Sequence, residues 1–483
     1  MTKRSYVAKS ARLGYLPNEC PSFGKLLLYA LQQFLVMFPA TVTVALLTGF
    51  DVPTTIFASG FSTLCVLLIT RGQIPLYYGS SFSYITAIVA ITSATVGEVA
   101  STELVGEAQF GIVISGLVSI VAGILVKLFG RKVIDKVLPP SITGSISLLI
   151  GLSLAVSALT PAIGYDATSG VTNGAEFATG LVTLFSCVLF SVYLKKGVLG
   201  QLPILFGITI GYVLAICLGL VDFSFFTDSQ IVIVPRFSLP IPNWMAVAAI
   251  MPIALATIPE STAHLYQLDI YVNDLAKREG KPRIDMAGKL GLSLVGDGMG
   301  DIISGMMGGP AGTNYGENVS TMAITKNFSS YVLGVTAIFA MAISFFKPIT
   351  GLVQSVPTAV IDGACIYLFG VIAAQGIAIM VNQKVDFFNP RNLAVIATVL
   401  IIGIGGTFGF DNGMIPVFGY QFPAIATASI FGILLNLLLG IAFKKKGKDE
   451  GKGLDKEKTA EQPATMAVVG DDEVVPSQTP KAQ

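Results

Sequence analysis

Apolar stretches long enough to cross a lipid bilayer recur along almost the whole sequence. A spanning helix needs about 20 mostly apolar residues. Charged residues make up only 12% of the chain, about half of the roughly 25% found in soluble domains. The pattern predicts an all-α polytopic membrane protein with fourteen spans, near residues 26–48, 53–70, 76–93, 109–130, 141–158, 174–194, 198–220, 243–266, 287–307, 313–328, 329–347, 357–380, 392–410 and 422–443.

The lysine and arginine residues predict how these spans are oriented. Basic residues are retained on the cytoplasmic side of a membrane. With the N-terminus placed inside, only Arg236 and Lys347 of the 30 Lys and Arg residues fall in loops expected outside. We therefore expect a multi-pass protein of the cell (plasma or inner) membrane with both termini in the cytoplasm.

Composition argues against several other classes of protein. The net charge of +1 gives no indication of a nucleic-acid partner. The five cysteines form no C-x-x-C pair, and most lie within apolar runs, which is typical of small buried side chains rather than disulfides or metal ligands. With one histidine and no combination of nucleophile, base and metal ligands, the chain is not expected to be an enzyme. We expect no catalytic residues, no metal and no bound cofactor.

Fourteen spans divide into two halves of seven. Because seven is odd, the second half must start on the opposite side of the membrane, which is the inverted-repeat plan of many secondary transporters. The third span of each half, near 76–93 and 313–328, is interrupted by glycine and polar residues. Broken spans at matching places point to a substrate site between them.

The sequence changes character after about residue 443. The stretch 444–483 is polar, charged and poor in aromatic residues, so we expect a disordered cytoplasmic tail. The lysines at 444–446 are interpreted as a positive flank that fixes topology, with contact to anionic lipid as the alternative.

Ionisable side chains inside a membrane are costly and usually functional. The chain's single histidine, His264, joins five acidic residues within the apolar spans: Glu260, Asp297, Asp301, Glu317 and Asp362.

Glu260 and His264 are four residues apart in the sequence PESTAHL, so both lie on one helix face. Pro259 removes one backbone donor beside the carboxyl and loosens the helix there. A carboxyl in a low-dielectric pocket can hold a proton near neutral pH and release it when its surroundings change. The alternative is a structural pair packed between helices.

The two interrupted stretches carry complementary groups. In residues 308–326, GGPAGTNYGENVSTMAITK, an extended segment leads into a half-helix that begins near Gly316 and leaves free backbone N–H groups at its start. In residues 74–85, IPLYYGSSFSYI, the motif GSSF adds backbone donors, two hydroxyls and the ring of Phe82. The two breaks can pair as short antiparallel strands, which would satisfy their backbones. Taken alone, GSSF is better explained as a small-residue helix contact.

These groups suit a small, neutral, planar ring with alternating N–H and C=O groups. Carboxyls accept from ring N–H groups, freed amides donate to carbonyl oxygens, and Phe82 offers a flat apolar surface. A phosphate or sulfate does not fit, because the two acids would repel it.

Together these motifs resemble the nucleobase–ascorbate transporter (nucleobase-cation symporter-2) family, and within it the bacterial uracil permeases. The similarity extends from about residue 24 to 443. It is carried by QQFLVMFPATV in the first span, GSSF at 79–82, PESTAHL at 259–265, and YGEN at 315–318 followed by MAITK at 322–326.

The resemblance implies a domain plan. A core domain would comprise 26–136 and 243–352, and a gate domain 137–242 and 353–443, between an N-tail at 1–25 and the C-tail. It also implies a homodimer formed through the gate domain.

The resemblance further implies roles for individual residues. It implies that the base is held by Glu260, Glu317, Phe82, Gly316, Ser81 and Tyr315. It implies proton symport, with the proton as the coupling ion and with Glu260 and His264 in the coupling. Supporting positions would be Gln33, Asp297, Asn318 and Thr325. Relatives that carry xanthine or urate usually have Gln-Asn where this chain has Glu317-Asn318, so uracil is favoured as the cargo.

Three residues depart from the family pattern. Gln33 stands where many relatives carry histidine, and Ser320 replaces the usual glycine of the signature. Asp301 is unexpected, and the sequence assigns it no role.

The mechanism expected from this reading is alternating access of the core domain against the gate domain. The alternatives are a purine permease of the same family, an anion exchanger or channel with the same 7+7 plan, and an intramembrane enzyme. The anion exchanger would have a basic or neutral site, whereas the expected site is acidic.

Overall fold

The computed structural model describes residues 13–130, 136–166, 170–194, 202–223, 231–410, 413–417 and 420–457. The chain forms two compact units, Met1–Asn436 and Leu437–Gln483. All the site residues lie in the first unit, to which the following description applies unless stated otherwise.

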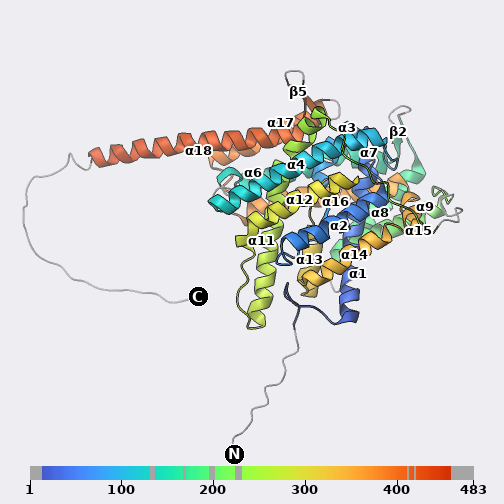
Figure 1. Ribbon diagram of the computed structural model, residues 1–483. Coiled ribbons are helices and arrows are strands. Elements are labelled where there is room, and N and C mark those ends of the chain that lie inside the picture. Colours follow the sequence, from blue (N-terminus) through green and yellow to red (C-terminus); the bar gives the residue numbers. More distant parts are fainter. Residues whose placement is uncertain are drawn as a thin grey trace, which may run out of the picture. The chain divides into compact units, whose positions relative to one another are not determined.

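Helices dominate this unit (Figure 1). The α-helices of the described chain are α1 (Phe23–Thr48), α2 (Val52–Ile69), α3 (Ile85–Thr92), α4 (Thr102–Phe129), α6 (Pro140–Ser153), α7 (Ala155–Ala162), α8 (Gly174–Tyr193), α9 (Pro203–Cys217), α10 (Trp244–Ile250), α11 (Ala254–Arg278), α12 (Leu290–Met307), α13 (Gly316–Thr325), α14 (Ser330–Ile343), α15 (Lys347–Gln354), α16 (Thr358–Asn382), α17 (Pro390–Gly409) and α18 (Ala424–Glu457).

Short 3-10 helices and strands complete the described chain. The 3-10 helices are η1 (Phe82–Tyr84), η4 (Met251–Ile253) and η5 (Ala287–Lys289). The strands form three antiparallel pairs: β1 (Tyr78–Ser80) with β4 (Gly312–Asn314), β2 (Tyr165–Asp166) with β3 (Val171–Thr172), and β5 (Met414–Val417) with β6 (Tyr420–Pro423).

Within the described residues, eight helical segments are long and apolar enough to cross a bilayer, and four shorter apolar helices accompany them. A helical, polytopic membrane protein is therefore confirmed. The count of fourteen spans and their inverted repeat stay predictions.

Side-chain caps set where several helices begin. The Asp51 carboxylate accepts from the N–H of Thr54 at 3.1 Å at the start of α2, and Ser101 caps α4 in the same way. These caps satisfy backbone donors that the first turn of a helix leaves free.

The helices pack in two groups. In one group α4 packs against α12, α12 against α2, and α2 against α14, with α1, α3, α10, α11 and α13 around them. Figure 1 shows α2, α4 and α12 running side by side. In the other group α16 packs against α6, α7, α8 and α9, and α17 packs against α6.

The contact between α4 and α12 depends on small residues. A Cβ at Gly298 would lie 2.3 Å from the carbonyl oxygen of Gly116, closer than any side chain allows. Glycine at this crossing lets the two backbones touch, which is how tightly packed membrane helices gain dispersion energy.

The two stretches expected to be interrupted meet in the first helix group. Strand β1 leads into η1 and α3, and strand β4 leads into α13. The strands pair antiparallel with Gly79 opposite Thr313. Their ladder satisfies backbone groups that a plain helix would have bonded internally.

Two boundaries differ most from the sequence expectation. Helix α11 continues to Arg278, beyond the predicted end at 266, because no glycine or proline interrupts the amphipathic stretch before Gly280. Helix α18 continues to Glu457, so the part of the predicted disordered tail from 444 to 457 is helical. Lysine and glutamate are good helix formers. The rest of that tail, 458–483, and residues 1–12 of the N-tail lie outside the described residues.

Candidate functional site

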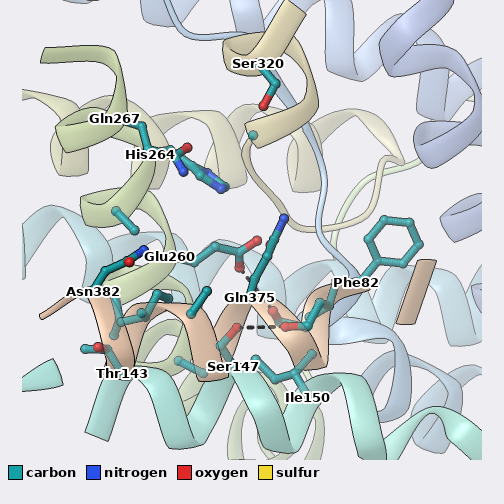
Figure 2. A pocket seen from close by; sticks show the side chains of 18 residues that line it. Phe82, Thr143, Ser147, Ile150, Glu260, His264, Gln267, Ser320, Gln375 and Asn382 are labelled. Atoms are coloured by element: carbon teal, nitrogen blue, oxygen red, sulfur yellow. Dashed lines mark hydrogen bonds between the residues drawn. The ribbon is translucent and has the colours of Figure 1, made fainter. Parts of the chain in front are cut away.

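A cavity of about 160 Å³ lies where the two helix groups meet (Figure 2). Its walls come from η1, α11 and α13 of the first group and from α6 and α16 of the second. The lining residues are Phe82, Ser83, Thr143, Ser147, Ile150, Ala256, Pro259, Glu260, Ala263, His264, Gln267, Gly316, Ser320, Ile372, Gln375, Ala378, Ile379 and Asn382.

Helix α11 presents Glu260 and His264 to this cavity. Their spacing of one turn places both on the same face, and Figure 2 shows both side chains directed inward. The Glu260 side chain is held from the β1–α3 segment, because the Ser83 hydroxyl donates to its Oε2 at 3.3 Å. Among the described residues the carboxylate thus has one hydrogen-bond donor, and it faces the cavity with its remaining acceptor capacity.

The imidazole of His264 packs against the start of α13. A Cβ on Gly316 would lie 2.6 Å from Nε2 of His264, so only glycine fits between the imidazole and the first turn of that helix. Gly316 also lines the cavity. The free N–H groups of this helix end therefore sit beside the cavity.

Phe82 joins the two helix groups. Its ring meets the ring of Phe369 on α16 edge-on, with centroids 5.8 Å apart and an interplanar angle of 75°. Such edge-to-face pairs are favoured by the ring quadrupoles. Phe82 is thus a wall of the cavity and a contact between the groups.

Glu317 lies differently from the sequence expectation. Its exposed side chain lines a second cavity of about 90 Å³, together with residues of α1, α9 and α16, rather than the cavity of Glu260. Successive helix residues point about 100° apart, so Gly316 and Glu317 face different spaces. The carboxyls of Glu317 and Asp297 nevertheless lie near enough to interact electrostatically with Glu260.

Two residues predicted to contact substrate are absent from the cavity wall. Ser81 is buried and caps η1, accepting from the N–H of Ser83 at 3.3 Å. The Tyr315 hydroxyl donates to the carbonyl of Ser80 at 3.0 Å and bonds the Thr41 hydroxyl at 3.0 Å. Tyr315 therefore ties α13 to β1 and α1.

Of the predicted supporting residues, Gln33 and Asn318 join two elements, whereas Thr325 bonds within its own helix. The Asn318 amide donates to the Gln33 side-chain oxygen at 2.7 Å and to its carbonyl at 3.1 Å, which joins α13 to α1. Thr325 bonds back to Thr321 at the end of α13. Asp297 is buried in α12.

Asp301, to which the sequence assigned no role, joins the two interrupted segments. Its Oδ1 accepts from the Tyr78 hydroxyl of β1 at 2.6 Å and from the N–H of Gly312 of β4 at 2.8 Å. All three groups are buried. One carboxylate oxygen on α12 thus anchors both strands of the ladder.

Sequence reasoning missed the polar residues that the second helix group contributes. These are Thr143 and Ser147 on α6, and Gln375 and Asn382 on α16. The signal was present, because Gln375 is an isolated amide in the apolar run FGVIAAQGIAIM. An uncharged amide carries a smaller bilayer cost than an acid, so its presence in an apolar run is a weaker sign of function.

A bundle of apolar helices that encloses an acid-lined polar cavity beside paired chain breaks defines a membrane transporter. The profile of the Permease family matches residues 24–412. Uracil permease of Bacillus caldolyticus is 36% identical over 87% of this chain and 94% of its own. Uracil permease of Bacillus subtilis is 35% identical over 85% and 92%. The putative pyrimidine permease RutG of Escherichia coli is 33% identical over 88% and 91%.

The chain therefore belongs to this permease family, and the resemblance inferred from its motifs is confirmed. It is a transporter and not an enzyme. Among solved structures, the murine Slc26a9 anion transporter aligns with a TM-score of 0.62 at 12% identity, over 91% of this chain and 73% of its own. The transmembrane domain of the cyanobacterial bicarbonate transporter BicA aligns with a TM-score of 0.54 at 12% identity, over 88% of this chain and all of its own. These likenesses concern the fold alone.

Proposed function

We propose that this protein is a proton-coupled symporter that imports a nucleobase, with uracil as the cargo. The observation that carries the proposal is the cavity in which the Glu260 carboxyl, the start of α13 at Gly316 and the Phe82 ring face a common space. The names of its relatives, uracil permeases at 32–36% identity, favour the same cargo.

The size and chemistry of the cavity support a small ring. Its volume of about 160 Å³ is below the roughly 300–1,000 Å³ typical of pockets for drug-sized ligands. A carboxylate accepts ring N–H groups, helix N–H groups donate to ring carbonyls, and an aromatic face covers the plane. A single pyrimidine ring satisfies all three.

Glu260 is the proposed proton carrier. It faces the cavity, has a single hydroxyl donor, and has two further carboxyls within electrostatic range. Protonation of Glu260 removes the repulsion between its carboxylate and these neighbouring carboxyls as the base enters. Loss of the proton restores the repulsion, and base and proton then leave together. His264 contributes by holding the start of α13 against α11.

Glu317 is the proposed second contact to the base. It directly follows Gly316 and faces the space between α13 and the second helix group. Movement of one group against the other would change which space receives this side chain. In the bound state it would accept ring N–H groups.

The two helix groups are the proposed core and gate domains. Residues 26–136 and 243–352 form the core, and residues 137–242 and 353–443 form the gate, as fourteen spans in a 7+7 inverted repeat. Transport would proceed by alternating access, with both termini in the cytoplasm. Dimerisation through the gate domain stays a prediction.

Anion exchange is less well supported. The structural neighbours that transport anions share only 12% identity with this chain. Of the described residues that line the cavity, none is Lys or Arg, whereas Glu260 contributes a carboxyl.

Uptake into proteoliposomes tests the proposal. The purified protein should accumulate radiolabelled uracil when an inward proton gradient is imposed, and a protonophore should abolish accumulation. Unlabelled xanthine and urate should compete weakly. Uracil accumulation that is the same with and without the proton gradient would refute proton coupling. The absence of uracil uptake would refute uracil as the transported base.

A further inference from the structure

The gate side of the cavity presents one amide at the level of Glu260. Gln375 lies on the face of α16 that also carries Ile372, Ile379 and Asn382 into the cavity. Figure 2 shows its side chain extending from α16 across the cavity toward the carboxyl of Glu260. The amide and the carboxyl therefore face the same space from opposite walls.

This amide is free to meet a ligand. Its side chain is exposed within the cavity, and among the described residues it has no hydrogen-bond partner. Its neighbours do not compete for it, because the Ser147 hydroxyl is directed to the carbonyl of Ile372 at 3.4 Å and the Ser83 hydroxyl to Glu260.

The core wall already carries one primary amide, Gln267 on α11, and Gln375 supplies a second from the opposite wall. The side chain of glutamine offers N–H donors and a carbonyl acceptor in one plane. An edge with N–H beside C=O, as in a lactam or imide, pairs with such an amide through two hydrogen bonds. The carboxyl of Glu260 can donate to a ring carbonyl only while it is protonated, whereas the amide of Gln375 carries donors and an acceptor whether or not Glu260 holds a proton.

We infer that Gln375 is a specificity residue of the gate, pairing with the lactam edge of the bound base opposite Glu260. This inference rests on the proposed nucleobase function and adds a second recognised edge. It also couples binding to conformation, since the base bridges the two helix groups only when Gln375 and Glu260 face each other across it.

The test compares Gln375→Ala and Gln375→Leu with wild type and with Gln383→Ala, a glutamine at the end of the same helix outside the cavity. Binding of uracil to the purified proteins is measured by calorimetry, and uptake is measured in proteoliposomes. The panel contains uracil, an analogue with its 4-carbonyl replaced by an amine, and an analogue lacking the 2-carbonyl.

Losing two neutral hydrogen bonds predicts a roughly 5- to 100-fold weaker affinity for uracil in both Gln375 variants. The preference for uracil over at least one altered analogue should fall by a similar factor. Gln383→Ala should match wild type. Unchanged melting temperatures and elution profiles would show that the variants fold.

The outcomes separate this inference from the function on which it rests. If wild type binds uracil and the Gln375 variants bind it equally well with the same preferences, Gln375 plays no part and only this inference fails. If wild type binds none of the panel, the nucleobase function and the inference fail together.

Discussion

The imidazole of His264 on α11 fills the space that a side chain at Gly316 would need at the start of α13, with only 2.6 Å between its Nε2 and a Cβ built there. Two segments more than fifty residues apart thus meet where the helix begins. The pairing fixes the half-helix against the wall that carries Glu260. Several consequences of this arrangement can be measured.

Gly316→Ala should impair transport severely. The added methyl must displace either the imidazole or the first turn of α13, and a shift of about 1 Å at a binding site can cost on the order of 100-fold. Initial rates of uracil uptake should therefore fall at least tenfold. Gly370→Ala on α16, where a Cβ meets nothing within 4 Å, is the matched control and should transport normally. Equal activity in the two variants would contradict a packing role for Gly316.

Glu260→Gln should separate binding from coupled accumulation. The amide imitates the protonated carboxyl, so uracil should still bind within about tenfold of wild type while uptake against a gradient is lost. Equilibrium binding and proton-driven uptake are measured on the same preparation. Glu103→Gln, at an exposed position in the first turn of α4, controls for removal of a carboxylate. Normal pH-dependent accumulation by Glu260→Gln would rule Glu260 out as the proton carrier.

Asp301 should act as a hydrogen-bond acceptor that anchors the strand ladder. Asp301→Asn keeps an oxygen able to accept from Tyr78 and Gly312, whereas Asp301→Leu leaves both buried donors unsatisfied at a cost of about 1–3 kcal/mol each. The asparagine variant should therefore transport with the pH profile of wild type, and the leucine variant should lose both stability and uptake. A shifted pH profile in Asp301→Asn would instead indicate that Asp301 takes part in proton transfer.

The segment around Tyr15 should detach from α13 on acidification. Its N–H donates to the carbonyl of Lys326 at 2.8 Å, and the N–H groups of Leu13 and Gly14 each donate to Glu279 at 3.2 Å. Burial acts to raise the pKa of Glu279, but hydrogen bonds from Lys281 and Gly14 outweigh it and lower that pKa. A lowered pKa stabilises the contact above the ordinary pKa of glutamate, and that stability is lost as the pH falls through the lowered value.

Hydrogen exchange measures this contact directly. After correction for intrinsic rates, protection of the Tyr15 amide should drop severalfold at acidic pH, and Glu279→Ala should show the same loss at neutral pH. Asp274→Asn, which breaks the exposed ion pair with Arg278, should leave it unchanged. If protection of the Tyr15 amide is the same at acidic and neutral pH and the same in Glu279→Ala as in wild type, Glu279 does not hold this segment.

The sequence determined the class of this protein and several residues on one wall of its cavity. The long apolar stretches and the low content of charged residues predict a polytopic helical protein. In a bilayer, few other structures provide hydrogen-bond partners for all backbone N–H and C=O groups. The cost of burying ionisable groups singled out Glu260 and His264, and helical spacing placed them on one face. Both line the cavity, together with Phe82 and Gly316.

Only the tertiary structure decided which side chains share a space. It turned Glu317 toward a second cavity, and it gave Ser81 a local cap at η1 and Tyr315 bonds to β1 and α1. It also explained Asp301, which holds the distant strand β1 together with the nearby strand β4. It also brought Gln375 opposite Glu260. The periodicity of a sequence gives the direction in which a side chain leaves its own helix axis. The partner that this side chain meets depends on how separate helices cross. That crossing is set by packing between residues far apart in the sequence.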